Sequence, residues 1–574
     1  MKSKWQDPEK SGVLGNKPAP QDITGHELLR KAERAFVTPE RLNAQKTWKL
    51  LTEFILPNEN RGWFGDPSKG IRRDRRVYDS CAIQSNRDLA SAMQSTITSP
   101  SAKWSRIRFK EEKLNEDNQA LEWLDGVSDV FHDALNESNF DRQIGRGYPC
   151  LSGLGMMILF QDEDFNFTCW SLVNVSWVEN DNGVIDTVYR KFKLTIKALY
   201  DKFGDKIGQE FLDKLEKHPL EEVEIYHIIE PRHKDLVKYN PLKLAGPLER
   251  PYASYYIIHK NGCIVEESGF YEFPVFVARW SCLPDEVYGF GPGSVALPDV
   301  RSLNKVREES LKALAKAVNP PIITSKQNMV SGDFRPGGTI VVRDPSQFKE
   351  FITQTKFDAV KLEVEDLKNS IKSTFYIDKL LLPPRNETGE MTAYEVSQRL
   401  EQMQQILGPV LSRFNSEFLN PLVMRSMNIL LRKNRIKPLP KSVEQKLSIE
   451  ARAIHNKATL DLNIVFVNSL ARSQQMSELQ NVQQWVQEIM QLAQMKPEAL
   501  DTVNSDAIVA YSAKVRTIPE SMLVPQQQVN AIRQQRQKQQ QAQAALQQGQ
   551  QAGDIAQSMG AAKQAMKPGG GQNG

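Results

Sequence analysis

The stretch "YGFGPGSVALPDVRSLNKVREESLKALAKAVNPPIIT" at residues 288–324 decides the fold of this chain. After a glycine-rich turn, its apolar residues recur at intervals of three and four up to "NPP", which predicts one long amphipathic helix. At about 1.5 Å per residue, such a helix is roughly 35 Å long. Its apolar stripe is too narrow to fill a globular core, so we expect the helix to pack beside other helices.

A second amphipathic helix is predicted over 358–382, and the prolines at 383–384 end it. The segment between the two helices, 319–357, contains two strand-like runs, "PIITS" and "GGTIVVRD", bounded by Gly and Pro turns. Helices of similar length with narrow stripes suit packing against copies of themselves, as in a ring of subunits. The stripe residues that we expect to pack between copies are Val300, Leu303, Leu314, Leu367 and Ile371.

A charged loop, "PPRNETGE" at 383–390, follows the second helix. Its prolines stop one helix, and Thr392 with Glu395 forms a capping box that starts the next, so both ends of the loop are fixed. The arginine suits a phosphate, the amide and hydroxyl suit sugar or phosphate, and the glutamates weaken the attraction. The alternative interpretation is an ordinary helix–helix turn. The candidate site residues of the loop are Arg385, Asn386, Glu387, Thr388 and Gly389.

The rest of the chain divides into segments with different sequence patterns. A helical pattern is expected over 26–56 and another amphipathic helix within 102–145, whereas 147–290 has the pattern of short strands and hairpins interrupted by one helix at about 194–216. A long helix kinked by prolines follows the charged loop, and helices with Gln-rich surfaces follow it. We therefore expect an α+β chain that is mainly helical. The N-terminal 25 residues and the Gln- and Gly-rich residues 541–574 have the composition of disordered tails.

The composition excludes several classes of protein. With 574 residues the chain is too long for one core, and no apolar run approaches the ~18 residues that span a bilayer. The start lacks the apolar core of a signal peptide, so we expect synthesis in the cytosol and no membrane partner. Five cysteines without CxxC spacing favour free thiols. A net charge of +4 disfavours tight, static binding of DNA but allows transient contact.

Motifs for catalysis are missing from the sequence. It contains neither a GxxxxGK[ST] phosphate loop nor HExxH, and the seven histidines form no metal-ligand pair at helical spacing. "GFGPGS" at 289–294 could cradle a phosphate, but it lacks the GxGxxG order, and a strand-to-helix turn fits better. The basic run "RRDRR" at 72–76 is more typical of a solvated face or a salt-bridged surface. We therefore expect no enzyme, no cofactor and no metal site.

This order of elements resembles the portal proteins of tailed bacteriophages, and more narrowly the head-to-tail connectors of short-tailed phages. The resemblance covers roughly residues 26–541. The matching blocks are the opening stretch, "YDSCAIQSNRDLASAMQSTITSPSAKW" (78–104) and "ETGEMTAYEVSQRLEQMQQILGPVLSRFNSEFLNPLVMRSMNILL" (387–431). Two later blocks also match, "ARSQQMSELQNVQQWV" (471–486) and "VRTIPESMLVPQQQVNAIRQQRQKQQQ" (515–541).

The resemblance implies a ring of twelve subunits at one vertex of the capsid, through which double-stranded DNA is packaged and ejected. It assigns the chain a wing (26–290), a first stem helix (291–318), a clip (319–357), a second stem helix (358–382), a channel loop (383–390), a long kinked wing helix (391–439) and a helical crown (440–540). The channel loop would face the DNA without reading its sequence.

The implied partners are the terminase large subunit, tail proteins, and the scaffolding and major capsid proteins, with assembly in the host cytoplasm and a final place in the virion. A structural helical adaptor of the head–tail junction that never touches DNA is the alternative, although it would need no charged loop between its helices. A phage-encoded hydrolase is the third class. It would need a convergent acid–base or metal site, which the sequence does not show.

Overall fold

The computed structural model describes residues 24–59, 76–100, 102–110, 118–233, 246–319, 322–325, 331–333, 335–342, 357–380, 408–437, 462–466 and short pieces between 478 and 541. The chain forms two compact units. The first contains the chain up to residue 474 except 115–122, and the second contains 115–122 and the chain from 475 onward.

A five-stranded antiparallel sheet, ordered β4-β5-β6-β7-β8, is the largest sheet of the first unit. Asn-Gly turns reverse the chain where Gly183 and Gly262 take φ angles of 71° and 66°. The region predicted to hold strands, 147–290, has its first strand at Met156, because helix α5 continues to Leu154. The strands are β4 Val175–Glu179, β5 Ile185–Thr195, β6 Glu222–Pro231, β7 Tyr252–Ile258 and β8 Ile264–Phe270.

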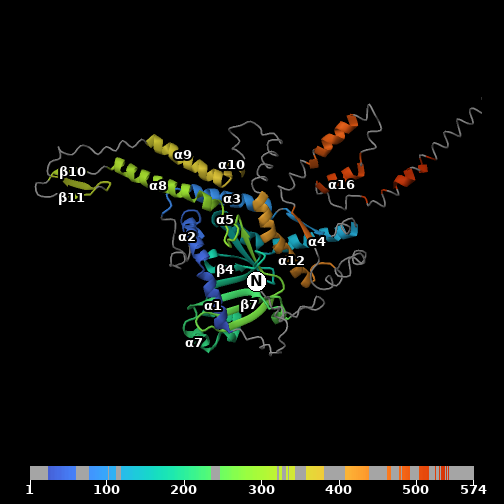
Figure 1. Ribbon diagram of the computed structural model, residues 1–574, viewed down its shortest axis with the longest axis horizontal. Helices are drawn as coiled ribbons and strands as arrows, with labels where there is room; N and C mark the ends of the chain where they lie inside the picture. Colours follow the sequence, from blue (N-terminus) through green and yellow to red (C-terminus); the bar gives the residue numbers. More distant parts are fainter. Residues whose placement is uncertain are drawn as a thin grey trace, which may run out of the picture. The chain divides into compact units, whose positions relative to one another are not determined.

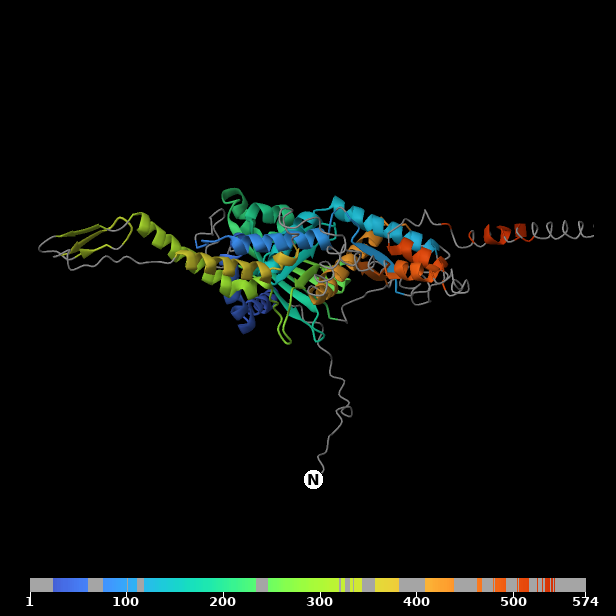
Figure 2. The same cartoon turned by 90° about the horizontal axis from the view of Figure 1, so that it is seen from above.

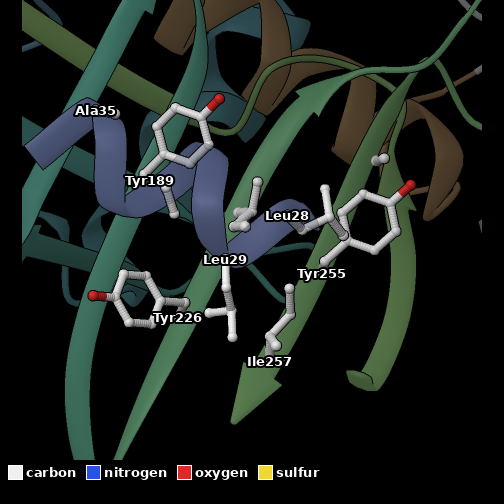
Figure 3. Close-up of a cluster of buried hydrophobic side chains, with 10 residues drawn as sticks. Leu28, Leu29, Ala35, Tyr189, Tyr226, Tyr255 and Ile257 are labelled. Carbon is white, nitrogen blue, oxygen red and sulfur yellow. The ribbon is translucent and has the colours of Figure 1, made fainter. Parts of the chain in front are cut away.

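Helix α1, Gly25–Phe36, covers one face of this sheet. Leu28 and Leu29 are buried among side chains of β6 and β7, including Tyr226 and Ile257, and Figure 3 shows them between the helix and the strands. Burying a leucine side chain contributes about 1.5–3 kcal/mol, so the apolar spacing of α1 explains its position on the sheet.

The opposite face carries α6, Ile196–Phe203, and α7, Gln209–Lys217, whose apolar residues share a cluster with β6 and β7. The prediction of one helix over 194–216 is wrong. Gly204 and Gly208 have positive φ angles of 61° and 90°, and a 3₁₀ turn separates the two helices. Glycine adopts this left-handed conformation readily, which ends a helix.

A second antiparallel sheet, ordered β3-β2-β9, packs against helix α5, which in turn packs against α2 and α3. Ser152 of α5 donates a hydrogen bond to the amide oxygen of Asn86 on α3 across 2.7 Å, and both side chains are buried. The strands are β2 Met156–Gln161, β3 Phe167–Trp170 and β9 Val275–Arg279, and the helices are α2 Pro39–Phe54, α3 Cys81–Ile97 and α5 Phe140–Leu154.

Helices α8, Pro292–Val318, and α9, Phe357–Thr374, lie side by side (Figure 1, Figure 2). The helix predicted over 358–382 ends earlier, because Tyr376 has a φ of 58° and the separate turn α10, Ile377–Leu380, follows. Beyond the C-terminal end of α8 lies a small sheet ordered β10-β12-β11, with β10 parallel and β11 antiparallel to β12. Its strands are β10 Ile322–Ser325, β11 Ser331–Gly332 and β12 Thr339–Val342.

The long helix after the charged loop contains a π-helical turn, η8, at Asn415–Leu419, and continues as α12, Asn420–Arg432. The turn precedes Pro421, one of the predicted kink sites, where a backbone N–H is lost. A helical crown was predicted over 440–540, but β13, Leu462–Phe466, is a strand that pairs antiparallel with β1, Ser105–Phe109. The amphipathic helix predicted within 102–145 is confirmed as α4, Asn118–Glu137, whereas strand β1 in the same range was not predicted.

The second unit contains helix α16, Ser505–Val515, whose Tyr511 hydroxyl donates to Glu478 across 2.9 Å. Within the described parts of both units, no helix combines the length and the apolar character needed to cross a membrane.

Candidate functional site

Asp79 lies just before the first residue of α3 and binds side chains of both α8 and α9. Its carboxylate accepts from the Arg307 side chain of α8 at 3.1 Å, pairs with Lys368 of α9 at 3.1 Å and accepts from the Cys81 backbone N–H at 2.9 Å. Burial alone would raise the pKa of Asp79, but these hydrogen bonds and charges outweigh it and lower the pKa below its ordinary value.

Buried Asn304 makes a second connection between α8 and the segment before α3. Its amide oxygen accepts from the backbone N–H of Tyr78 at 2.8 Å and of Asp79 at 3.3 Å, while its amide nitrogen donates to Val300. Ser370 of α9 donates to Asp299 of α8 across 2.6 Å. Polar groups therefore fix the angle at which the helix pair leaves the rest of the unit.

The glycines of "GFGPGS" serve close packing of the turn that starts α8. A Cβ on Gly291 would lie 2.9 Å from the Cα of Gly155, and one on Gly293 would collide with the backbone oxygen of Gly153. Phe290 exchanges two backbone hydrogen bonds with Ser281. The prediction of a strand-to-helix turn is therefore confirmed, and the glycines are explained without a phosphate.

The C-terminal half of α8 carries a ladder of exposed ion pairs, that is, a series of pairs along one side of the helix. Lys305 pairs with Glu309 at 2.7 Å, and Lys312 pairs with Glu308 at 2.7 Å. Such pairs one helical turn apart support an exposed helix only weakly. They keep this part of the helix polar on one side while its apolar residues lie elsewhere.

The predicted stripe residues fall into two groups. Val300, Leu303 and Ile371 are at most 1% exposed, so they already belong to the core of their own chain, and Leu367 is half-buried. Leu314 is 51% exposed. The role of the five residues in contacts between copies stays a prediction, but a neighbouring chain can reach only the exposed ones. The large apolar side chains exposed on the helix pair are Val295, Leu311, Leu314, Val318 and Leu362.

The charged loop at 383–390 lies outside the described residues, as do its candidate residues Arg385, Asn386, Glu387, Thr388 and Gly389. At the other end of the helix pair, the described part of the β10-β12-β11 segment exposes Arg335, whose guanidinium binds the carboxylate of Asp333 at 2.8 Å. These hydrogen bonds lower the pKa of Asp333 to about 2. The two residues form a local charge pair on this segment.

A buried arginine, Arg279 of β9, joins three parts of the chain. Its guanidinium pairs with Glu417 in the π-helical turn at 2.7 Å and with Glu179 of β4. The backbone N–H of Arg279 also donates to Glu417 at 3.1 Å. Sequence analysis missed this contact because the partners are 100 and 138 residues away and no local pattern marks them.

A second buried arginine, Arg425 of α12, makes similar contacts about two turns after Glu417. It pairs with Glu163 at 3.0 Å and with Glu272 at 3.2 Å, and Arg432 binds the same two carboxylates. The long helix is thereby fixed to the loops that follow β2 and β8. Among the described residues, no group of three or more His, Cys, Asp or Glu side chains has the arrangement of a metal site.

The comparisons with known proteins give consistent results. A family model described as "Bacteriophage head to tail connecting protein" matches residues 29–523. The portal protein of Salmonella phage epsilon15 is 28% identical over 529 residues, which cover 89% of this chain and 91% of that protein. The probable portal protein of Bordetella phage BPP-1 is 29% identical over 527 residues, which cover 88% and 91%.

Proposed function

Because this chain belongs to the bacteriophage head to tail connecting protein family, we propose that it is the subunit of a ring-shaped portal, twelve copies of which surround a DNA channel at one vertex of the capsid. The single observation that supports this most strongly is the extent of the family match, 29–523, which includes both long helices and the charged loop. The relatives named portal protein match over nine-tenths of their length.

In this proposal, α8 and α9 are the stem of the subunit. The contacts of Asp79 and Asn304 attach these two helices to the rest of the subunit. Leu311, Leu314 and Val318 form an exposed apolar stripe on α8. Three exposed apolar residues at intervals of three and four are costly in water and favour contact with the next subunit. The β10-β12-β11 segment is the clip, which meets the terminase large subunit during packaging and tail proteins afterwards.

The charged loop is the part that we propose to contact double-stranded DNA. One arginine among two glutamates attracts a phosphate only weakly, and the near-balanced net charge of +4 supports a channel through which DNA slides. Scaffolding and major capsid proteins would surround the wing in the virion. In this proposal the motor is another protein, which agrees with the lack of a phosphate-loop motif in this sequence.

Disruption of the gene for this chain in its phage tests the proposal. We expect capsid shells that contain no packaged genome, and we expect a supplied copy of the intact chain to restore packaging. Shells with full-length DNA in the absence of the chain would exclude the portal function. A normal packaged genome with missing tails would instead favour an adaptor that acts only at the head–tail junction.

A further inference from the structure

A row of polar side chains crosses the five-stranded sheet on the face that α1 does not cover. Arg190 on β5 pairs in register with His227 on β6, which pairs with Tyr256 on β7, which pairs with Glu266 on β8. Residues paired in this way lie on the same face of a sheet. The row is flanked by α6, which supplies Lys202, and by β3.

Arg190 is held between two aromatic rings. Its guanidinium carbon lies 4.5 Å from the ring centroid of Trp170 and 4.4 Å from that of Phe192. The side chain is half-buried, and no hydrogen bond or ion pair to another described residue engages it. Cation–π contacts use the flat face of a guanidinium and leave its N–H donors in the plane free for an acceptor.

Lys202 adds a second positive charge beside this row of side chains. Its ammonium lies 4.0 Å from the ring centroid of Tyr256, the side chain is exposed, and it too forms no ion pair within the described chain. The two cations influence each other, because Arg190 contributes to lowering the pKa of Lys202, although burial contributes most. Like charges held near each other are stabilised when an anion lies between them.

Two buried ring nitrogens beside this row have no hydrogen-bond partner among the described residues. His227 is 1% exposed and stacks on Tyr256 with ring centroids 4.1 Å apart, and its Nε2 contacts the Ser254 hydroxyl at 3.0 Å. The Nδ1 of His227 and the Nε1–H of Trp170 have no partner. Burial and the two nearby cations lower the pKa of His227 well below its ordinary value, so this ring is neutral.

Two carboxylates face the row, and neither neutralises it. Glu266 raises the pKa of Lys202 without forming an ion pair with it. Asp162 acts on Tyr256 from a distance, and its carboxylate is occupied by hydrogen bonds from the backbone of Asp164 and Asn166 in its own turn.

We propose that Arg190 and Lys202, with the indole N–H of Trp170, form a binding site for an oxyanion of the phosphate class. A planar guanidinium edge matches two phosphate oxygens, and the exposed ammonium adds a point charge. The aromatic rings around the half-buried guanidinium strengthen its attraction for an anion by excluding water. This site lies on the five-stranded sheet and does not depend on ring formation or on the charged loop.

Thermal unfolding of the full-length protein with added inorganic phosphate tests the site, with sodium chloride used to hold the ionic strength constant. We expect a saturable rise of the midpoint temperature in the wild-type protein. Arg190→Gln should weaken phosphate binding on the order of tenfold, as expected for loss of a charge-assisted, two-pronged contact. Trp170→Phe, which keeps the ring but removes the N–H, should weaken it less.

Lys191→Gln is the matched control. It removes one positive charge from the next residue of β5, but its ammonium lies over Phe36 on the opposite face, 4.9 Å from that ring centroid. This variant should bind phosphate as the wild type does. Equal weakening in Lys191→Gln and Arg190→Gln, or no saturable effect in the wild type, would overturn the proposal.

Phosphorus NMR line broadening on the wild-type protein gives a second measurement that needs no variant, in case Arg190→Gln fails to fold. Binding of adenosine monophosphate with similar strength would identify a phosphate monoester as the ligand, and its exclusion would identify free phosphate. Acetate at the same ionic strength should have no effect. A response to acetate as strong as that to phosphate would contradict the assignment to the phosphate class.

Discussion

The guanidinium of Arg279 and the carboxylate of Glu417 lie 2.7 Å apart, and they join strand β9 to the π-helical turn of the long helix. The backbone N–H of Arg279 adds a hydrogen bond to the same carboxylate. Because Glu179 binds the other side of the guanidinium, this one side chain links two sheets to the long helix. The long helix is therefore held in place at its π-helical turn.

Glu417→Gln should destabilise the subunit by about 2 kcal/mol, because it leaves a buried guanidinium with one carboxylate instead of two. The free energy of unfolding in urea measures this loss. Glu309→Gln, in the exposed ladder of α8, is the matched control and should leave the unfolding midpoint unchanged. Equal effects of the two substitutions would show that the Arg279 contact contributes no more than a surface pair.

Acid should weaken the attachment of the helix pair through Asp79. Its pKa is lowered in the folded chain, so the unfolded state binds the proton more readily. The stability from Asp79 is therefore fully present above the ordinary carboxyl pKa of about 3.9 and is lost as the pH falls through the lower, folded-state value.

Asp79→Asn isolates this effect, since asparagine still accepts a hydrogen bond but carries no charge. Chemical unfolding at pH 6 should show the variant clearly less stable than the wild type, and the difference should shrink as the pH approaches 3. A difference that stays constant over this range would contradict a role for the Asp79 charge.

Two leucines of α8 should respond differently to the same substitution. Leu303 is 1% exposed, so Leu303→Asp places a charge in the core of the subunit and should cost several kcal/mol of folding stability. Leu314 is 51% exposed, so Leu314→Asp should leave the subunit folded and instead weaken contacts between copies. Circular dichroism reports folding, and sedimentation velocity reports assembly. Rings of normal size in the Leu314 variant would remove this residue from the proposed interface.

The sequence predicted the elements of the helix pair well but not their partners. Periodicity placed a stripe through Val300, Leu303 and Ile371, and the turn before α8 was recognised from its glycines and proline. A stripe does not reveal what covers it, and here the first unit itself covers these three residues. The end of helix α9 before Tyr376 could not be predicted from the sequence either. The positive φ of this tyrosine is set by its surroundings and not by its residue type.

Long-range contacts explain most of the remaining differences. Strand β13 pairs with β1 across more than 350 positions of the sequence, so the local sequence pattern around β13 did not indicate a strand. The aromatic and cationic row of Arg190, His227 and Tyr256 depends on the register of three strands, which alternation alone does not fix. The family resemblance, which rests on several blocks spread along the chain, was confirmed by the comparisons with known proteins.

Replacement of 385–388 with Gly and Ser tests the charged loop. If the loop guides DNA, rings and procapsids should still form, but less DNA should be packaged or retained, because the weak phosphate contacts are gone. The length of the packaged genome, measured by gel electrophoresis of DNA from purified particles, gives the answer. Full-length, stably held genomes would leave the loop as a connection between helices.

Electron microscopy of the purified full-length protein tests the central proposal most directly. The portal assignment predicts closed rings with an open axial channel, and class averages should resolve twelve repeated subunits with α8 and α9 of each subunit packed against its neighbours. A compact monomer, or an assembly without a channel, would contradict the proposal that this chain forms the passage for DNA.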